Sequence, residues 1–534
     1  MHRRFSILVA TATAAVLVLT ADSQIYDTNF YMLWEATAIL AGDHPYRDFF
    51  EWGAPLAAYA SAGMQLLVGY RLIGEFLLHW TFIVAGVVLA FDLGLRLARS
   101  AAAALVMLVA ALIVVAYTPT YHYSKLFFLP LLVWLAWRYL DRPGPGRAAA
   151  LAAATATAFL FRHDYGVYLG FGSALTLATA LAAVPAMRRW PVVARDVAVY
   201  AAVTTAIVGP LAVLVETNEG IVTYVETRAT RTPSVVDPAY YALLDPAPLR
   251  ALVGAAVPPS SAGVEVLEQL LLLVPLALLA SAARQGWRSR RSGAEIPTDV
   301  WRLAFAGVFL VVVDSGLFRE PAYLVTLAPL TAALASRYLA CGSGAAPVAT
   351  GLRRALAVGL VLLGGYAALV WTRGSIIQQP VELVKSVPRA FTTLLASPPV
   401  AAASPLDGNP ALSMAYLREC TVPGDRLIVT GSTPFQVNYY AERPFAGGHV
   451  YWHHGWRADP AHERQSLALI LQHPVPFAFS TTDPVLKDFE RYPRIHEYLV
   501  QHYSELPGSG GRALVDRRRH ATRAYGPLNL PCFR

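Results

Sequence analysis

The sequence contains few charged residues. Asp, Glu, Lys and Arg make up 15% of its 534 residues, hydrophobic residues make up 56%, and the mean hydropathy is +0.44. A chain of this size with so little charge is too apolar to fold as a water-soluble globule. The composition therefore excludes a large soluble enzyme and predicts a polytopic membrane protein.

Several common signatures of enzymes are also absent. The sequence has no phosphate-binding P-loop, no GxSxG elbow, no HExxH zinc motif and no GxGxxG motif after a strand. Lysine is scarce, since only Lys125, Lys385 and Lys487 occur. Much of the net charge of +8 reflects the arginine bias of membrane loops, so nucleic acid is not an expected partner.

Apolar runs long enough to cross a bilayer recur up to residue 372. Because a spanning helix needs about 20 apolar residues, the runs predict an α-helical polytopic membrane protein with about 11 transmembrane helices. The runs are 5–21, 76–97, 101–117, 126–140, 148–161, 165–184, 197–215, 266–283, 300–316, 321–339 and 355–372. The first run also fits a signal peptide, but Leu19-Thr20-Ala21 is a poor cleavage site, which favours a retained helix.

The distribution of arginine sets the orientation. With the N-terminus inside, basic residues outnumber carboxylates in the inner loops, and carboxylates outnumber basic residues in the outer loops. We therefore expect a protein of the bacterial cytoplasmic membrane with a cytoplasmic N-terminus. The loop 22–75 and the C-terminal tail would lie on the periplasmic or extracellular side.

The tail 373–534 has a different pattern, without apolar runs long enough to span. Strands and helices are predicted to alternate over 426–430, 434–441, 461–472, 475–480, 484–503 and 512–516. This order predicts a small extracytoplasmic α/β domain following a membrane domain of residues 1–372. Of the three cysteines, Cys420 and Cys532 lie in this tail, where an oxidising compartment would allow a disulfide.

Polar residues occur at the outer ends of several predicted helices. They are Asp27, Glu35, Arg47 and Asp48 in the first loop, His122 and Lys125, then Arg162, His163 and Asp164, and finally Arg319 and Glu320. Charges near hydrocarbon are costly and normally face a cavity or pair with one another. Cations, a carboxylate and apolar walls together suit a site that binds a lipid phosphate.

The first external loop resembles a known family. Asp27 follows the first span, Gly42-Asp43-His44-Pro45-Tyr46-Arg47-Asp48-Phe49 follows an aromatic stripe, and Ala54-Pro55-Leu56 ends the loop. This order is similar to that of membrane glycosyltransferases of the GT-C class, in the branch of the aminoarabinose transferase and the protein O-mannosyltransferases. Phe318-Arg319-Glu320-Pro321 resembles the basic motif before a late helix of that family. Ala54 stands in place of the first proline of the family's Pro-Pro-Leu, and the sugar is not carried over.

The resemblance implies transfer of a sugar from a polyprenyl-phosphate donor to a lipid, glycan or protein acceptor, with inversion. Asp27 would be the general base. Arg319, Arg162, His163, Lys125 and Arg47 would bind the donor phosphate, and Glu35, Asp48, Asp164, His122 and Glu320 would bind the acceptor or support the site. Because the leaving group is a phosphomonoester, protein cations could replace a metal, and no obligatory metal or other cofactor is expected.

Simpler interpretations of the same residues remain open. Asp27 also suits a helix N-cap, Glu35 a surface charge, and Arg47 with Asp48 an ion pair that fixes the loop. The Arg162-His163-Asp164 triplet also suits an interfacial anchor, and His449 to Trp456 a packed aromatic loop rather than a metal or sugar site. For the whole chain, the alternatives are a transporter or flippase for a lipid-linked or anionic substrate and a non-catalytic envelope assembly protein.

Overall fold

The structure is a computed structural model that describes residues 2–25, 29–51, 53–116, 123–229, 260–317, 327–339, 380–396, 414–431, 434–449, 452, 457–526 and 529–534. It divides into two compact units. The first contains Met1–Gln24 and His79–Ala390, and the second contains Ile25–Leu78 and Phe391–Arg534. Residues 25–75 of the predicted first external loop therefore belong to the same unit as the C-terminal residues. The predicted boundary at 372/373 lies outside the described residues.

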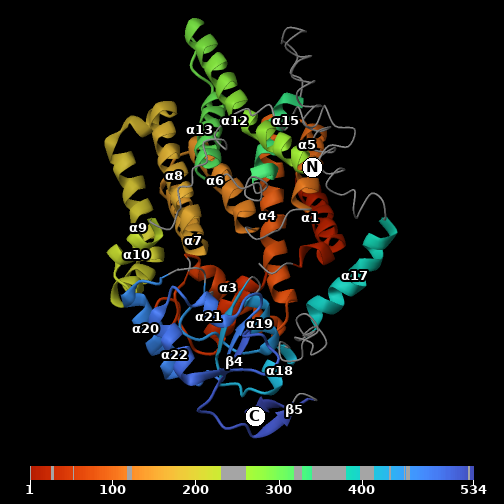
Figure 1. Cartoon of the computed structure of the whole chain (residues 1–534). Coiled ribbons are helices and arrows are strands. Elements are labelled where there is room, and N and C mark those ends of the chain that lie inside the picture. Colours follow the sequence, from red (N-terminus) through yellow and green to blue (C-terminus); the bar gives the residue numbers. More distant parts are fainter. Residues whose placement is uncertain are drawn as a thin grey trace. The chain divides into compact units, whose positions relative to one another are not determined.

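The first unit is built from helices (Figure 1). They are α1 (His2–Leu19), η1 (Ala21–Gln24), α4 (Ile73–Ala98, which begins in the second unit), α5 (Ala101–Ala116), α6 (Tyr123–Asp141), α7 (Pro145–Phe161), α8 (His163–Ala183), η3 (Pro185–Arg188), α9 (Trp190–Asn218), α10 (Ile221–Ala229), α12 (Ser260–Arg291), α13 (Thr298–Leu317), α15 (Ala328–Leu339) and α17 (Pro380–Leu395, which ends in the second unit).

Each predicted apolar run that the structure describes falls on one of these helices, whereas 355–372 and the beginning of 321–339 lie outside the described residues. The helices α10 and α17 and the short η1 and η3 match none of the predicted runs. Three described helices, α4, α8 and α9, are long and apolar enough to cross a membrane. The chain is thus mostly helical with several apolar helices, and the exact number of spans stays a prediction.

Glycines allow the helices of the first unit to approach closely. A Cβ atom on Gly86 of α4 would lie 1.9 Å from the carbonyl oxygen of Leu126 in α6. One on Gly172 of α8 would lie 2.2 Å from Leu132 of α6 and 2.8 Å from Phe309 of α13. Small residues at such crossings are typical of membrane helix packing, and Figure 1 shows α6, α7 and α8 side by side.

The second unit combines helices with a sheet. Its elements are α2 (Asn29–Leu40), α3 (Pro55–Val68), α18 (Met414–Glu419), β1 (Leu427–Thr430), α19 (Pro434–Ala441), α20 (Pro460–Gln472), β2 (Phe477–Ser480), α21 (Val485–Asp488), α22 (Pro493–His502), β3 (Tyr503–Glu505), β4 (Ala513–Asp516), β5 (Arg523–Tyr525) and β6 (Leu530–Cys532). The strand order of the main sheet is β1-β2-β4-β3, with β1 and β2 parallel and the other pairs antiparallel. β5 and β6 form a separate antiparallel pair.

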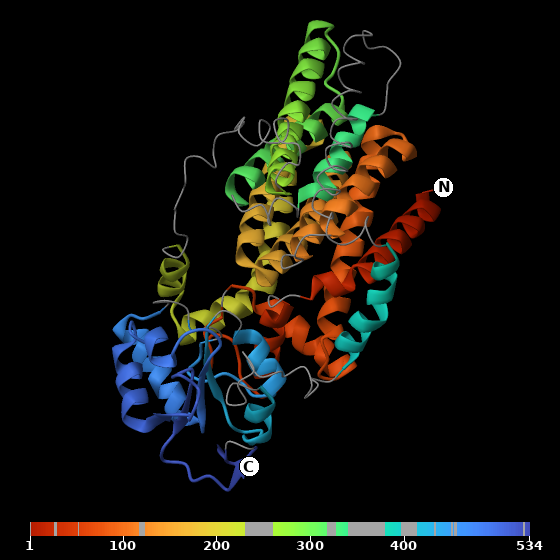
Figure 2. The same cartoon turned by 45° about the vertical axis from the view of Figure 1, so that its right-hand side comes forward.

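Alternation along the strands builds an apolar core on each face of the main sheet. Leu427 and Val429 of β1 join a cluster with residues of α18 and α19, whereas Ile428 joins a cluster with residues of α20 and α22. Successive side chains of a strand point to opposite faces, so helices cover the sheet on both sides. Figure 2 shows these two helical layers around the strands. The predicted small α/β region at the C-terminal end is therefore present.

The structure corrects one predicted element of the tail and adds others. The helix expected over 484–503 is two helices, α21 and α22, because Pro493 lacks the backbone N–H needed in a helix interior and instead occupies the first turn of α22. The short elements α18, β3, β5 and β6 were not expected from the sequence. None of them exceeds six residues, so their apolar patterns are too short to recognise.

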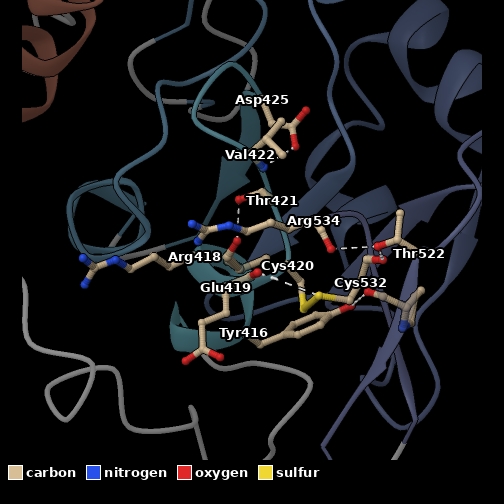
Figure 3. The surroundings of a disulfide bond; sticks show 12 residues. Tyr416, Arg418, Glu419, Cys420, Thr421, Val422, Asp425, Thr522, Cys532 and Arg534 are labelled. Carbon is tan, nitrogen blue, oxygen red and sulfur yellow. Dashed lines mark hydrogen bonds between the residues drawn. A yellow bond between two sulfur atoms is a disulfide. The ribbon is translucent and has the colours of Figure 1, made fainter.

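A disulfide joins Cys420, which follows α18, to Cys532 in β6, with Cα atoms 4.4 Å apart (Figure 3). This is the pair that the sequence suggests. The Tyr416 hydroxyl donates a 2.6 Å hydrogen bond to the carbonyl of Pro531, and the backbone N–H of Phe533 donates to the carbonyl of Cys420. The C-terminus is thus fastened to α18 and to the adjacent core.

Candidate functional site

Glu35 is a buried carboxyl group in the first external loop. It lies in α2, its exposed fraction is 0%, and neither of its oxygens has a hydrogen-bond partner in the described part of the chain. Burial raises the pKa of Glu35 well above the ordinary value, and the nearby charge of Glu51 raises it further. A surface charge, one interpretation open from the sequence, is therefore wrong for Glu35.

Glu51 is a second buried carboxyl group in the same loop. One oxygen accepts a 2.6 Å hydrogen bond from the Tyr46 hydroxyl and another from the backbone N–H of Gly53, and the other oxygen accepts from Ala54. Gly53 and Ala54 directly precede α3, which begins at Pro55. Glu51 therefore organises the entry into α3, and sequence reasoning missed this role. The only available signal was an acidic residue four positions before a proline that begins a helix.

Arg47 and Asp48 form an ion pair in the same loop. Arg47 Nη2 lies 2.6 Å from Asp48 Oδ2, and this oxygen also accepts a 2.8 Å hydrogen bond from the backbone N–H of His44. The side chain of Arg47 is 51% exposed. The pair matches the structural interpretation that the sequence left open, and binding of the donor phosphate by Arg47 stays a prediction.

The first unit brings together polar residues from α6 and from the junction between α7 and α8. Arg162 adopts an extended conformation with φ −169° and ψ 127°, which ends α7 and precedes α8. Arg162 Nε lies 3.0 Å from Asp164 Oδ1, and Lys125 Nζ lies 3.9 Å from Asp164 Oδ2. Residues about 40 positions apart in the chain therefore form one group of charged side chains that pair with one another.

This cluster, made of Lys125, Arg162 and Asp164, is largely shielded from solvent. Lys125 has an exposed fraction of 0% and its Nζ lies 4.9 Å from the centre of the Tyr165 ring, which the guanidinium of Arg162 also approaches, at 5.5 Å. Two basic side chains thus share one carboxylate and one aromatic ring. His163 lies beside the cluster in sequence, and its Nδ1 is 2.6 Å from the hydroxyl of Tyr224 in α10.

Four predicted site residues, Asp27, His122, Arg319 and Glu320, lie outside the described residues. The described ones are divided between the units: Glu35, Arg47 and Asp48 belong to the second, and Lys125, Arg162, His163 and Asp164 to the first. Within the first unit Lys125, Arg162 and Asp164 lie close together, and within the second unit Arg47 pairs with Asp48 while Glu35 is buried apart from any partner among the described residues. The roles assigned to individual residues stay predictions.

The two described residues of the aromatic segment in the tail, His449 and Trp452, are buried and pack on each other. The His449 ring stacks on Trp452 with centroids 3.9 Å apart, and His449 Nε2 lies 2.9 Å from the Ser466 hydroxyl in the buried core. Residues 450, 451 and 453–456 lie outside the described residues. In the described ranges no group of three or more His, Cys, Asp or Glu side chains could hold a metal ion, and independence from metal stays a prediction.

Among known proteins, matches to this chain are found with solved structures but not with family models or curated proteins. Among solved structures, it is similar to the crystal structure of ArnT from Cupriavidus metallidurans bound to undecaprenyl phosphate, with a TM-score of 0.46 and 14% identity over 96% of this chain and 97% of the other. A likeness at this level leaves the function to be argued from the residues of the chain itself.

Proposed function

We propose that this protein is a membrane glycosyltransferase that moves a sugar from a polyprenyl-phosphate donor to an acceptor outside the cytoplasm. In the reaction, the acceptor oxygen forms a bond to the anomeric carbon on the side opposite to the phosphate. The bond between that carbon and the phosphate oxygen breaks, and the phosphate leaves with the electron pair. The proton of the acceptor hydroxyl passes to the Asp27 carboxylate, and the configuration of the sugar inverts.

The observation that carries this proposal is the cluster of Lys125, Arg162 and Asp164. A leaving polyprenyl phosphate gains negative charge in the transition state, and cations in a poorly solvated setting stabilise that charge strongly. Lys125 is fully buried, and side-chain nitrogens of Lys125 and Arg162 both lie within 4 Å of the Asp164 carboxylate. An anion that enters this group would meet two donors already held in position.

The first loop supports the other half of the proposal. Its resemblance to GT-C loops assigns the base to Asp27, and the same loop contains two buried carboxyl groups, Glu35 and Glu51. Buried carboxyls are costly unless the fold or a ligand compensates them, and Glu35 has no partner among the described residues. We assign Glu35 to binding the hydroxyl groups of the acceptor, for which a protonated carboxyl offers both a donor and an acceptor.

The test is transfer in vitro by the purified full-length protein from undecaprenyl-phosphate sugars, with product detected by mass spectrometry. Asp27→Asn should lower kcat by about 10²- to 10⁴-fold while donor binding persists. Lys125→Met should weaken donor binding roughly 10- to 100-fold, since a charged hydrogen bond to the phosphate is lost. Lys487→Met is the matched control, because Lys487 is 61% exposed and pairs with Asp483 at the surface.

Two outcomes would overturn the proposal in part or in whole. The first, normal transfer by Asp27→Asn, would overturn the assignment of Asp27 as the base. The second is movement of a lipid-linked substrate across liposome membranes by a protein that transfers no sugar from any donor supplied, which would favour the transporter or flippase. A requirement for a divalent cation, measured as loss of transfer in EDTA and recovery with Mg²⁺ or Mn²⁺, would overturn the metal-free part alone.

A further inference from the structure

The C-terminal α/β domain, described here as residues 414–534, contacts the first external loop within the second unit. Arg426, which precedes β1, donates from Nη1 to Asp43 Oδ2 and from Nη2 to Asp43 Oδ1, both at 2.7 Å. The two side chains are only 12% and 11% exposed. A two-point ion pair of this kind fixes both distance and orientation, and it joins residues 383 positions apart.

Backbone contacts extend the same attachment. The N–H of Phe50 donates a 2.8 Å hydrogen bond to the carbonyl of Gly448, and Phe50 forms a parallel bridge with His449. Gly448 has φ +72°, and a Cβ atom there would lie 2.6 Å from Leu469 and 3.3 Å from the carbonyl oxygen of Asp48. Only glycine therefore allows the loop to lie this close to the domain.

Aromatic packing completes the contact. Phe445 of the domain makes edge contacts with Trp34 and Phe49 of the loop, with ring centroids 4.8 and 5.5 Å apart. These residues and Ala38 form a buried core of their own. The guanidinium of Arg457 lies 4.3 Å from the ring centre of Phe50.

The anchored residues are the chain neighbours of the buried carboxyls. Trp34 precedes Glu35 and Phe50 precedes Glu51, so the contacts with the domain fix the backbone on which both carboxyls stand. We propose that the C-terminal domain is a positioning element for the catalytic loop, with Arg426 as its principal positioning residue. This inference rests on the proposed glycosyl transfer for its kinetic readout, but not for its structural one.

The experiment compares Arg426→Gln with Arg518→Gln in the full-length protein. Arg518 is a matched control, since it also makes an ion pair, with Asp516 at 2.8 Å, but this pair lies wholly within the domain. Hydrogen exchange is measured over residues 41–51 together with kcat and KM for the lipid donor. Arg426→Gln should speed exchange over 41–51 and lower kcat about 10- to 100-fold, the effect expected of a small misplacement, with donor KM little changed.

Further variants distinguish loss of loop positioning from misfolding of the protein. Arg426→Lys keeps the charge but loses the two-point geometry, so it should retain the fold and give an intermediate effect. The double variant Asp43→Arg/Arg426→Asp should recover part of the exchange protection that Arg426→Gln loses. Unchanged exchange over 41–51 in Arg426→Gln, or equal effects of Arg426→Gln and Arg518→Gln, would overturn the inference.

The two proposals fail in different ways. If the wild-type protein transfers no sugar, the proposed function is lost, and the exchange data still decide whether the domain holds the loop. If transfer is present but Arg426→Gln lowers only donor affinity, the domain acts on donor binding and the positioning role is refuted.

Discussion

Replacing Glu35 by Gln should make the stability of the protein less sensitive to pH. Glu35 is completely buried, both of its oxygens are without partners among the described residues, and burial raises its pKa well above the ordinary 4.5. Between the ordinary value and the raised one, the unfolded chain has lost the proton of Glu35 while the folded protein retains it. Folding therefore takes up a proton, and stability falls as pH rises through this window.

The size of the effect follows from the linkage relation. One proton retained by the folded state costs about 1.4 kcal/mol of unfolding free energy for each pH unit above the unfolded-state pKa. Glu35→Gln cannot titrate, so its stability relative to wild type should rise with that slope from about pH 4.5 until Glu35 itself ionises. Any constant cost of burying the amide shifts the curve but leaves its slope unchanged.

The assay is denaturant unfolding of the detergent-solubilised protein at a series of pH values, with Glu490→Gln as the control because Glu490 is exposed. Parallel pH curves for wild type and Glu35→Gln would show that Glu35 keeps no proton on folding. A slope of opposite sign would mean that the folded state favours the carboxylate. Either result refutes the description of Glu35 as an uncompensated buried acid.

Two further predictions concern each unit separately. Replacing Cys420 and Cys532 by Ser opens a loop of 112 residues. For a loop of that length, the chain-entropy relation gives a loss of about 5 kcal/mol of unfolding free energy. An equal unfolding midpoint for the reduced and the oxidised wild-type protein would contradict this prediction. Gly86→Ala forces a methyl group toward the Leu126 carbonyl oxygen and should cost roughly 1–3 kcal/mol as a lower melting midpoint in detergent. Gly63→Ala in α3, whose Cβ would meet nothing within 4 Å, is its control and should leave the midpoint unchanged or raise it, because Ala favours a helix interior over Gly.

The sequence predicted the features of the fold that depend on local patterns. Apolar runs located α4, α8 and α9, and the charged triplet Arg162-His163-Asp164 marked the break between α7 and α8 because charges interrupt an otherwise apolar stretch. Alternating residues located β1, β2 and β4. Burial of Lys125 beside Asp164 was not visible, since it depends on how α6 meets the α7–α8 junction.

What the sequence could not give was the grouping of distant segments. The pair of Asp43 and Arg426 joins the first external loop to the residue that precedes β1, and neither residue stands out from other charged residues in its segment. The sequence leaves a surface charge open for Glu35 for a similar reason. Its burial in the second unit, where Phe445 packs on the neighbouring Trp34, depends on chain folding rather than on the helical pattern of α2.

This grouping also decides how the C-terminal domain can be studied. A chain truncated at residue 380 would leave Asp43 without the guanidinium that compensates its nearly buried charge. It would also expose Trp34 and Phe49, which pack on Phe445. Loss of activity after truncation would then follow from collapse of the first loop even if the domain never touched substrate. Single changes at the contact, such as Arg426→Gln, separate the two causes because they leave the domain core and its disulfide in place.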